Sequence, residues 1–212
     1  MQEVRPPKGA PVPLRQRRVW TDLARIFSTV FNPFLTAFAL FVILAHAFGT
    51  GTVGFWKLLF ASTFFTSIGP MLFIFWLYAT GRIADMDMSR REEREAVFTA
   101  FVLFYLGGTA TLWLLHAPAM ITASMAGYAA SALVVQLITR YWKISTHALG
   151  ITAPLIALVY LYGTQPLPFL VLIPIVCWAR VYLKAHTVLQ VIAGGALGAV
   201  TVVLFFHIFH VV

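Results

Sequence analysis

Residues Thr187–His210 read TVLQVIAGGALGAVTVVLFFHIFH, an apolar run without lysine, arginine, aspartate or glutamate. A helix needs about 20 consecutive apolar residues to cross the hydrocarbon core of a bilayer. Lipid offers no hydrogen-bond partners, so a spanning segment must satisfy its own backbone groups, as a helix does. The run also lacks the alternation of a barrel strand. It predicts a transmembrane helix.

Six further apolar runs precede this one, and short polar or Gly/Pro-containing segments separate them. A kink is expected at Asn32-Pro33, near the start of the first run, because proline interrupts a helix. We therefore predict an all-α integral membrane protein, a bundle of about seven (six to seven) transmembrane helices. The six runs are Ile26–Phe48, Trp56–Thr80, Ala96–Leu115, Pro118–Thr139, Ala148–Tyr162 and Pro166–Trp178.

Composition leaves no room for a large soluble domain. The chain is 60% hydrophobic and 10% charged, whereas soluble domains carry about 25% charged residues. We expect residues 1–25 to form a basic, Pro-rich cytoplasmic tail and interfacial segment, and residues 26–212 to form a single transmembrane domain. Within residues 18–27 the apolar side chains share one helical face, which is typical of an interfacial helix that serves as an anchor.

The basic residues are distributed unevenly between the two ends of the predicted spans. With seven spans, fourteen of the fifteen lysines and arginines share one face, and only Lys57 falls at an opposite turn. The positive-inside rule makes that face cytoplasmic. The expected location is a multi-pass position in the cell inner or plasma membrane, with the N-terminus in the cytoplasm. Because the charges lie between apolar runs and form no solvated stripe, nucleic acid is not an expected partner.

Two of the polar segments on this face contain histidine next to arginine or lysine. The first ends Lys-Ile-Ser-Thr-His-Ala (Lys143–Ala148), and the second, Ala179–His186, leads directly into the last apolar run. Ionisable residues at membrane-helix ends are candidates for function by default. The Gly194 and Gly198 pair that follows is a small-xxx-small pattern, which favours close helix packing.

These segments resemble the motifs of the type 2 phosphatidic acid phosphatase superfamily. The last motif of that family is Ser-Arg, five residues, His, three residues, Asp, followed by small residues. Here Arg180, His186 and Gln190 keep the same spacing, and Val191–Gly198 reproduces the small-residue tail. The family's middle motif, Pro-Ser-Gly-His, is matched in half by Ile144-Ser-Thr-His147. The similarity covers roughly residues 140–200.

The resemblance implies a phosphatase that uses no metal or other cofactor. His186 would attack phosphorus to form a phosphohistidine, and His147 would protonate the leaving oxygen. Arg180 and Ser145, with backbone amides near Thr146, would hold phosphate oxygens. These residue types suit the chemistry, because histidine exchanges protons near neutral pH and arginine binds phosphate through a planar fork. Further phosphate ligands are expected among the arginines that precede the third run: Arg94 first, then Arg82, Arg90 and Arg91.

This chain departs from the family pattern at two important places. Gln190 stands where the family has aspartate; at i+4 it can accept the ring N–H of His186 but brings no charge. The first family motif, Lys, six residues, Arg-Pro, is absent as such. Counting back from Arg94 puts Asp87 at the lysine position, and Glu95 replaces the proline. Acids of this segment, Asp85 and Asp87 above all, are expected to supply the charge that Gln190 lacks.

Three functions remain open from the sequence. The favoured one is a membrane phosphatase that hydrolyses a lipid phosphate or prenyl diphosphate through phosphohistidine. The second is a non-catalytic membrane protein that binds lipid phosphates. The third is a Mg²⁺-dependent prenyl transferase, since Asp85 and Asp87 could hold the metal against a diphosphate. The bilayer and a lipid phosphate are the expected partners, and the oligomeric state is left open.

Overall fold

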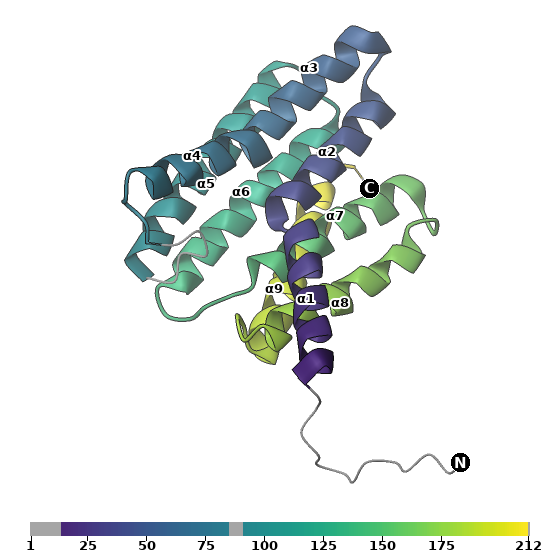
Figure 1. The fold of residues 1–212 in the computed structure, drawn as a ribbon. Helices are drawn as coiled ribbons and strands as arrows, with labels where there is room; N and C mark the ends of the chain where they lie inside the picture. Colours follow the sequence, from purple (N-terminus) through teal and green to yellow (C-terminus); the bar gives the residue numbers. More distant parts are fainter. Residues whose placement is uncertain (1–13, 85–90, 212) are drawn as a thin grey trace, which may run out of the picture.

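The computed structural model describes residues 14–84 and 91–211, and the side chains of residues 18–84 and 93–211. Its described residues form helices and connections, with no strand, which confirms the all-α prediction. Figure 1 shows the helices as an elongated bundle with α9 behind α7 and α8. The elements are α1 Leu14–Val30, α2 Pro33–Phe48, α3 Gly51–Thr63, the π-helical turn η1 Phe64–Ile68, α4 Gly69–Ala79, α5 Arg91–Leu114, α6 Ala119–Thr139, α7 Thr146–Tyr162, the 3-10 helix η2 Leu167–Val171, α8 Leu172–Tyr182 and α9 Val188–Ile208.

The first predicted run, Ile26–Phe48, is divided between two helices. Helix α1 continues past the expected interfacial segment to Val30, and α2 begins at Pro33 after a bend of 47°. The break follows from local chemistry: proline suits the first turn of a helix, and Asn32 caps that turn by accepting hydrogen bonds from the amides of Phe34 and Leu35. The expected kink at Asn32-Pro33 is therefore present, and residues 26–30 belong to the amphipathic helix.

The second predicted run is one continuous stretch of helix, Gly51–Ala79. Its centre widens into η1, where the amide of Gly69 donates to the carbonyl of Phe64. Pro70 explains this shift, because it has no N–H for the regular ladder. The Ser67 hydroxyl in the same turn donates to the carbonyl of Phe34 at 2.8 Å, which ties the turn to α2.

By length and composition, four helices among the described residues could cross a membrane, and five if α1 and α2 are taken together. The predicted number of seven spans is not confirmed, because α7 and the η2–α8 segment are apolar but shorter. Large apolar side chains are exposed on the outside of the bundle, for example Val53, Leu103 and Trp113 at 65–82%. Such a surface is compatible with a lipid bilayer.

Helices α7 and α9 pack closely against each other, and glycines of α9 make the contact possible. A Cβ on Gly194 would overlap the carbonyl oxygen of Ser145, and a Cβ on Gly198 would lie 2.8 Å from the carbonyl oxygen of Leu149. The small-xxx-small pattern therefore has the packing role that the sequence predicts. On the other side of α7, a Cβ on Gly150 would lie 2.9 Å from Cα of Pro33, so the start of α2 is held against α7.

The connections that contain the candidate site residues lie at one end of the bundle. Figure 1 shows the α6–α7 and α8–α9 connections at the lower end, together with α1, which packs against α8. The α2–α3, α5–α6 and α7–α8 connections lie at the other end. The two histidine segments of the sequence thus meet, although about forty residues separate them.

A first prediction concerns the α7–α9 contact. Gly194→Ala should lower the melting temperature of the detergent-solubilised protein, because the new methyl group must displace the Ser145 carbonyl. Overpacking of this kind costs about 1–3 kcal/mol. Gly195→Ala is the matched control, since its Cβ would meet only the Thr152 hydroxyl at 3.4 Å, an ordinary contact. Equal melting temperatures for the two variants would contradict this packing.

Candidate functional site

Gln190 holds the ring of His186 and fixes which of its nitrogens carries hydrogen. The side-chain oxygen of Gln190 lies 3.2 Å from Nδ1 of His186. The same oxygen accepts the backbone N–H of Thr187 at 3.1 Å, as part of a capping box at the start of α9. An atom that accepts from a backbone amide must be the oxygen and not the amide nitrogen. Nδ1 of His186 is therefore the donor, and Nε2 carries the lone pair when the ring is neutral.

His147 and Arg180 meet at a residue of α1. The guanidinium of Arg180, in the last turn of α8, donates from Nη1 to the hydroxyl of Ser28 at 2.7 Å. Burial, together with the charges of Arg180 and His186, lowers the pKa of His147 from 6.5 to about 3. A hydrogen bond from the ring to the backbone of the same Ser28 opposes this shift, so the backbone group is an acceptor, the carbonyl. Arg180 and His186 lie close enough to His147 to act on its charge. The two histidines and Arg180 thus form one cluster.

Two helices begin at this cluster, and their first turns are linked. Ser145 is the N-cap of α7, where its hydroxyl accepts the amide of Ala148 at 3.3 Å. Thr187 is the N-cap of α9. The amide of Ser145 donates to the carbonyl of Gln190 at 3.2 Å, which joins the two helix starts. Helix N-termini carry partial positive charge and free N–H groups, so this arrangement favours an anion.

The electrostatic surroundings of His186 are positive. Burial, together with the positive charges of Lys143, Arg180 and Arg94, lowers the pKa of His186 from 6.5 to about 4, while the hydrogen bond to Gln190 opposes the shift. A histidine with this pKa is neutral at pH 7, so its Nε2 lone pair is available. The same cations would attract a phosphate group.

The other predicted site residues divide into three groups. Arg94 contributes to the field at His186. Thr146 is the first residue of α7. Ser145 is completely buried, and its hydroxyl caps this helix. The sequence suggested Ser145 as a direct phosphate ligand. Arg82 lies 4.5 Å from the centre of the Trp76 ring, a cation–π contact at the end of α4.

The structure describes only some of the acidic residues that were expected to support Gln190. Asp85, Asp87 and Arg90 lie outside the described residues, and so do the side chains of Arg91 and Glu92. Glu93 accepts the amide of Ala84 at 3.1 Å, and Glu95 lies 3.9 Å from Nε of Arg140. The described residues contain no group of three or more His, Cys, Asp or Glu side chains that could hold a metal ion.

Two residues of the cluster were not singled out as site residues from the sequence. Ser28 lies in the helix that the sequence analysis interpreted as an anchor, and Lys143 was counted only among the charges that orient the chain. One sequence signal bears on Ser28. A helix stopped by Asn32-Pro33 leaves carbonyl groups in its last turn without intrahelical donors, so a donor from elsewhere in the fold is needed there.

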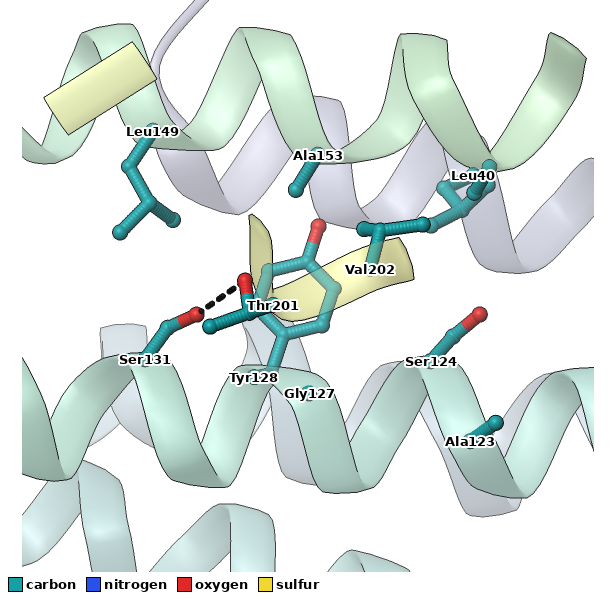
Figure 2. Close-up of a pocket in the computed structure, with 11 residues that line it drawn as sticks. Leu40, Ala123, Ser124, Gly127, Tyr128, Ser131, Leu149, Ala153, Thr201 and Val202 are labelled. Carbon is teal, nitrogen blue, oxygen red and sulfur yellow. Dashed lines mark hydrogen bonds between the residues drawn. The ribbon is translucent and has the colours of Figure 1, made fainter. Parts of the chain in front are cut away.

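A small cavity lies in the interior of the bundle, apart from the histidine cluster (Figure 2). Side chains of α2, α6, α7 and α9 line it, and the hydroxyl of Ser131 donates to that of Thr201 at 3.0 Å. No atom of the described residues hydrogen-bonds to the buried hydroxyl of Tyr128, which lies among these side chains. The space suits about one water molecule. The cavity has no charged lining and is not a phosphate site.

Comparisons with protein families, with curated proteins and with solved structures give no match for this chain.

The second prediction tests the field at His186. Lys143→Gln removes a positive charge that disfavours the protonated ring, so the pKa of His186 should rise from about 4 toward 6.5. Histidine-selective carbon-13 NMR in detergent measures this, with His186→Gln assigning the signal. Lys184→Gln is the control, because it removes the same charge from an exposed position in the neighbouring loop. An unchanged His186 titration in Lys143→Gln would contradict the arrangement.

Proposed function

We propose that this protein is a membrane phosphatase that hydrolyses a lipid phosphate or prenyl diphosphate through a phosphohistidine, without a metal ion. One observation carries the proposal: the neutral His186, with hydrogen on Nδ1, lies in a cluster of cations and helix N-termini. A lone pair for phosphorus and a set of positive groups for phosphate oxygens are what phosphoryl transfer requires. The family resemblance of the two motifs supports the same reaction.

In the first half of the reaction, Nε2 of His186 attacks phosphorus and the bond from phosphorus to the lipid oxygen breaks. His147 gives a proton to that oxygen, and the lipid leaves as an alcohol or, from a diphosphate, as a monophosphate. His147 can be protonated for this step because the incoming phosphate adds negative charge beside the ring. Its hydrogen bond to Ser28 uses one ring nitrogen and leaves the other for the substrate.

In the second half, His147 accepts a proton from water, and the resulting hydroxide attacks the phosphohistidine. The bond between nitrogen and phosphorus breaks, its electron pair returns to Nε2, and orthophosphate leaves. Arg180, Arg94 and Lys143 stabilise the charge on the phosphoryl oxygens in both steps. The reaction consumes one water and needs no oxidant or metal.

A lipid substrate suits the position of the cluster at an end of an apolar bundle. The headgroup would lie among the cations while the hydrocarbon chain stays in the bilayer. We propose that this end is cytoplasmic, because the predicted alternation of seven spans puts fourteen of the fifteen lysines and arginines on the same face as the histidine segments.

The third prediction is the direct test. The purified protein in detergent should release orthophosphate from phosphatidate or farnesyl diphosphate in the presence of EDTA. His186→Ala and His147→Ala should each reduce kcat at least about 10³-fold, as loss of a nucleophile or its proton partner does in other covalent hydrolases. Protein quenched in alkaline detergent, in which an N–P bond is stable, should contain phosphate in wild type and not in His186→Ala. Wild-type turnover in His186→Ala would remove this residue from the mechanism.

The same assay separates the alternatives. Turnover that EDTA abolishes and Mg²⁺ restores would favour metal-dependent chemistry, with Asp85 and Asp87 as the first candidates for the metal. Binding of lipid phosphate without any phosphate release would favour the binding protein.

The fourth prediction concerns Gln190. Gln190→Glu keeps the length and the acceptor of the capping box and adds a negative charge next to Nδ1 of His186. If this missing charge limits the rate, kcat should rise several-fold, and the pKa of His186 should rise with it. Gln190→Met is the matched control, because it fills similar space without accepting a hydrogen bond, and it should lower kcat. An unchanged kcat in both variants would mean that the contact at 3.2 Å plays no part in turnover.

A further inference from the structure

Helix α1 ends at the histidine cluster and contributes Ser28 to it. Ser28 is 7% exposed and Arg180 is 8% exposed, so their hydrogen bond at 2.7 Å is shielded from water. Hydrogen bonds to a charged group contribute more than neutral ones, and more still where the surroundings are apolar. The hydroxyl of Ser28 therefore restrains the guanidinium of Arg180 in one orientation.

The backbone of Ser28 acts on the second partner. Because α1 ends at Val30, the carbonyl of Ser28 is one of the last four of the helix, which lack intrahelical donors. The neighbouring carbonyl of Thr29 is satisfied by the side chain of Asn32 at 2.9 Å. The carbonyl of Ser28 accepts instead from the ring of His147. The C-terminal end of a helix carries partial negative charge, which also suits a histidine that becomes positive during the reaction.

Close packing of α1 on α8 brings Ser28 into this position. Helices α1 and α8 pack against each other. Ala24 of α1 and Ala179 of α8 are both completely buried, and their small side chains allow close packing. One turn before Ala24, the rings of Trp20 and Trp178 meet edge to face at 5.9 Å. Ser28 lies one turn after Ala24 on the same side of α1, which directs it toward Arg180.

We propose that Ser28 is a positioning residue of the site: its hydroxyl orients Arg180 for the phosphate group. This inference rests on the proposed function, and it adds α1 to the machinery. Ser28 touches no reacting atom, so it acts only through Arg180. A side-chain substitution removes the hydroxyl contact and retains the backbone of Ser28.

The experiment compares Ser28→Ala with Thr29→Ala, which removes a hydroxyl from the exposed side of the same turn. Binding of orthophosphate to the full-length protein in detergent is measured by calorimetry, and turnover of phosphatidate is measured separately. Ser28→Ala should weaken orthophosphate binding and raise KM by about tenfold, the loss of one hydrogen bond to a charge, with a smaller change in kcat. Thr29→Ala should match wild type.

Two further variants keep the result decisive. Ser28→Thr restores a hydroxyl and should recover part of the lost affinity, which a purely structural role would not produce. If Ser28→Ala lowers the melting temperature so far that it does not fold, Ser28→Cys, which is close in size and a weak acceptor, takes its place. Wild-type affinity for orthophosphate in folded Ser28→Ala, or in Ser28→Cys where the alanine variant does not fold, would overturn the inference.

The outcomes also separate this inference from the proposed function. Loss of orthophosphate affinity in Ser28→Ala, in a protein that releases no phosphate from any lipid, would support Ser28 and reject the hydrolytic reaction. Normal turnover with a KM that does not depend on Ser28 would support the hydrolytic reaction and reject the role of Ser28. A wild-type protein that binds no orthophosphate would overturn both.

Discussion

The guanidinium of Arg180 is a permanent charge in a residue that is only 8% exposed, so the groups around it must stabilise that charge. A buried charge is tolerated only where hydrogen bonds and opposite partial charges replace the water that it loses. Arg180 sits in the last turn of α8, where the helix carbonyls supply negative partial charge, and Ser28 adds the end of a second helix. The amphipathic helix α1 is thus part of the solvation of this charge.

Opposite helix ends meet at the cluster, and the partial positive charges of the two helix starts favour an anion there. The starts of α7 and α9 bring N–H groups and positive partial charge, while Arg180 comes from the last turn of α8 and contacts Ser28 near the end of α1. The two starts are joined through the Ser145 amide, and Gly194 lets α9 approach that segment closely. A phosphate group would find donors on one side, while the cations that attract it are already oriented on the other.

Much of this arrangement follows from sequence reasoning, and the failures have physical causes. Hydropathy located the helices well, since apolar length is the main constraint on a segment in lipid. It misjudged Ile26–Val30, because amphipathic and spanning helices share apolar residues and only the Asn32-Pro33 break divides them. Motif spacing singled out His147, Arg180 and His186, and the structure places these three residues close together. Ser28 was missed, since its contacts depend on how α1 packs across α8, and no local pattern encodes that.

Gln190 is consistent with the charge balance of this cluster. The charges that act on His186 come from Lys143, Arg180 and Arg94, all of them cations. A carboxylate at position 190 would stabilise a positive ring, but it would also cancel part of the field that draws phosphate in. The amide keeps the directional part of the interaction, because its oxygen holds both Nδ1 of His186 and the first turn of α9. It gives up the charge and leaves the whole positive field at the cluster. In the phosphatase that we propose, such a site would favour binding of the phosphate over stabilisation of the phosphohistidine, so its affinity for phosphate should be high relative to its turnover.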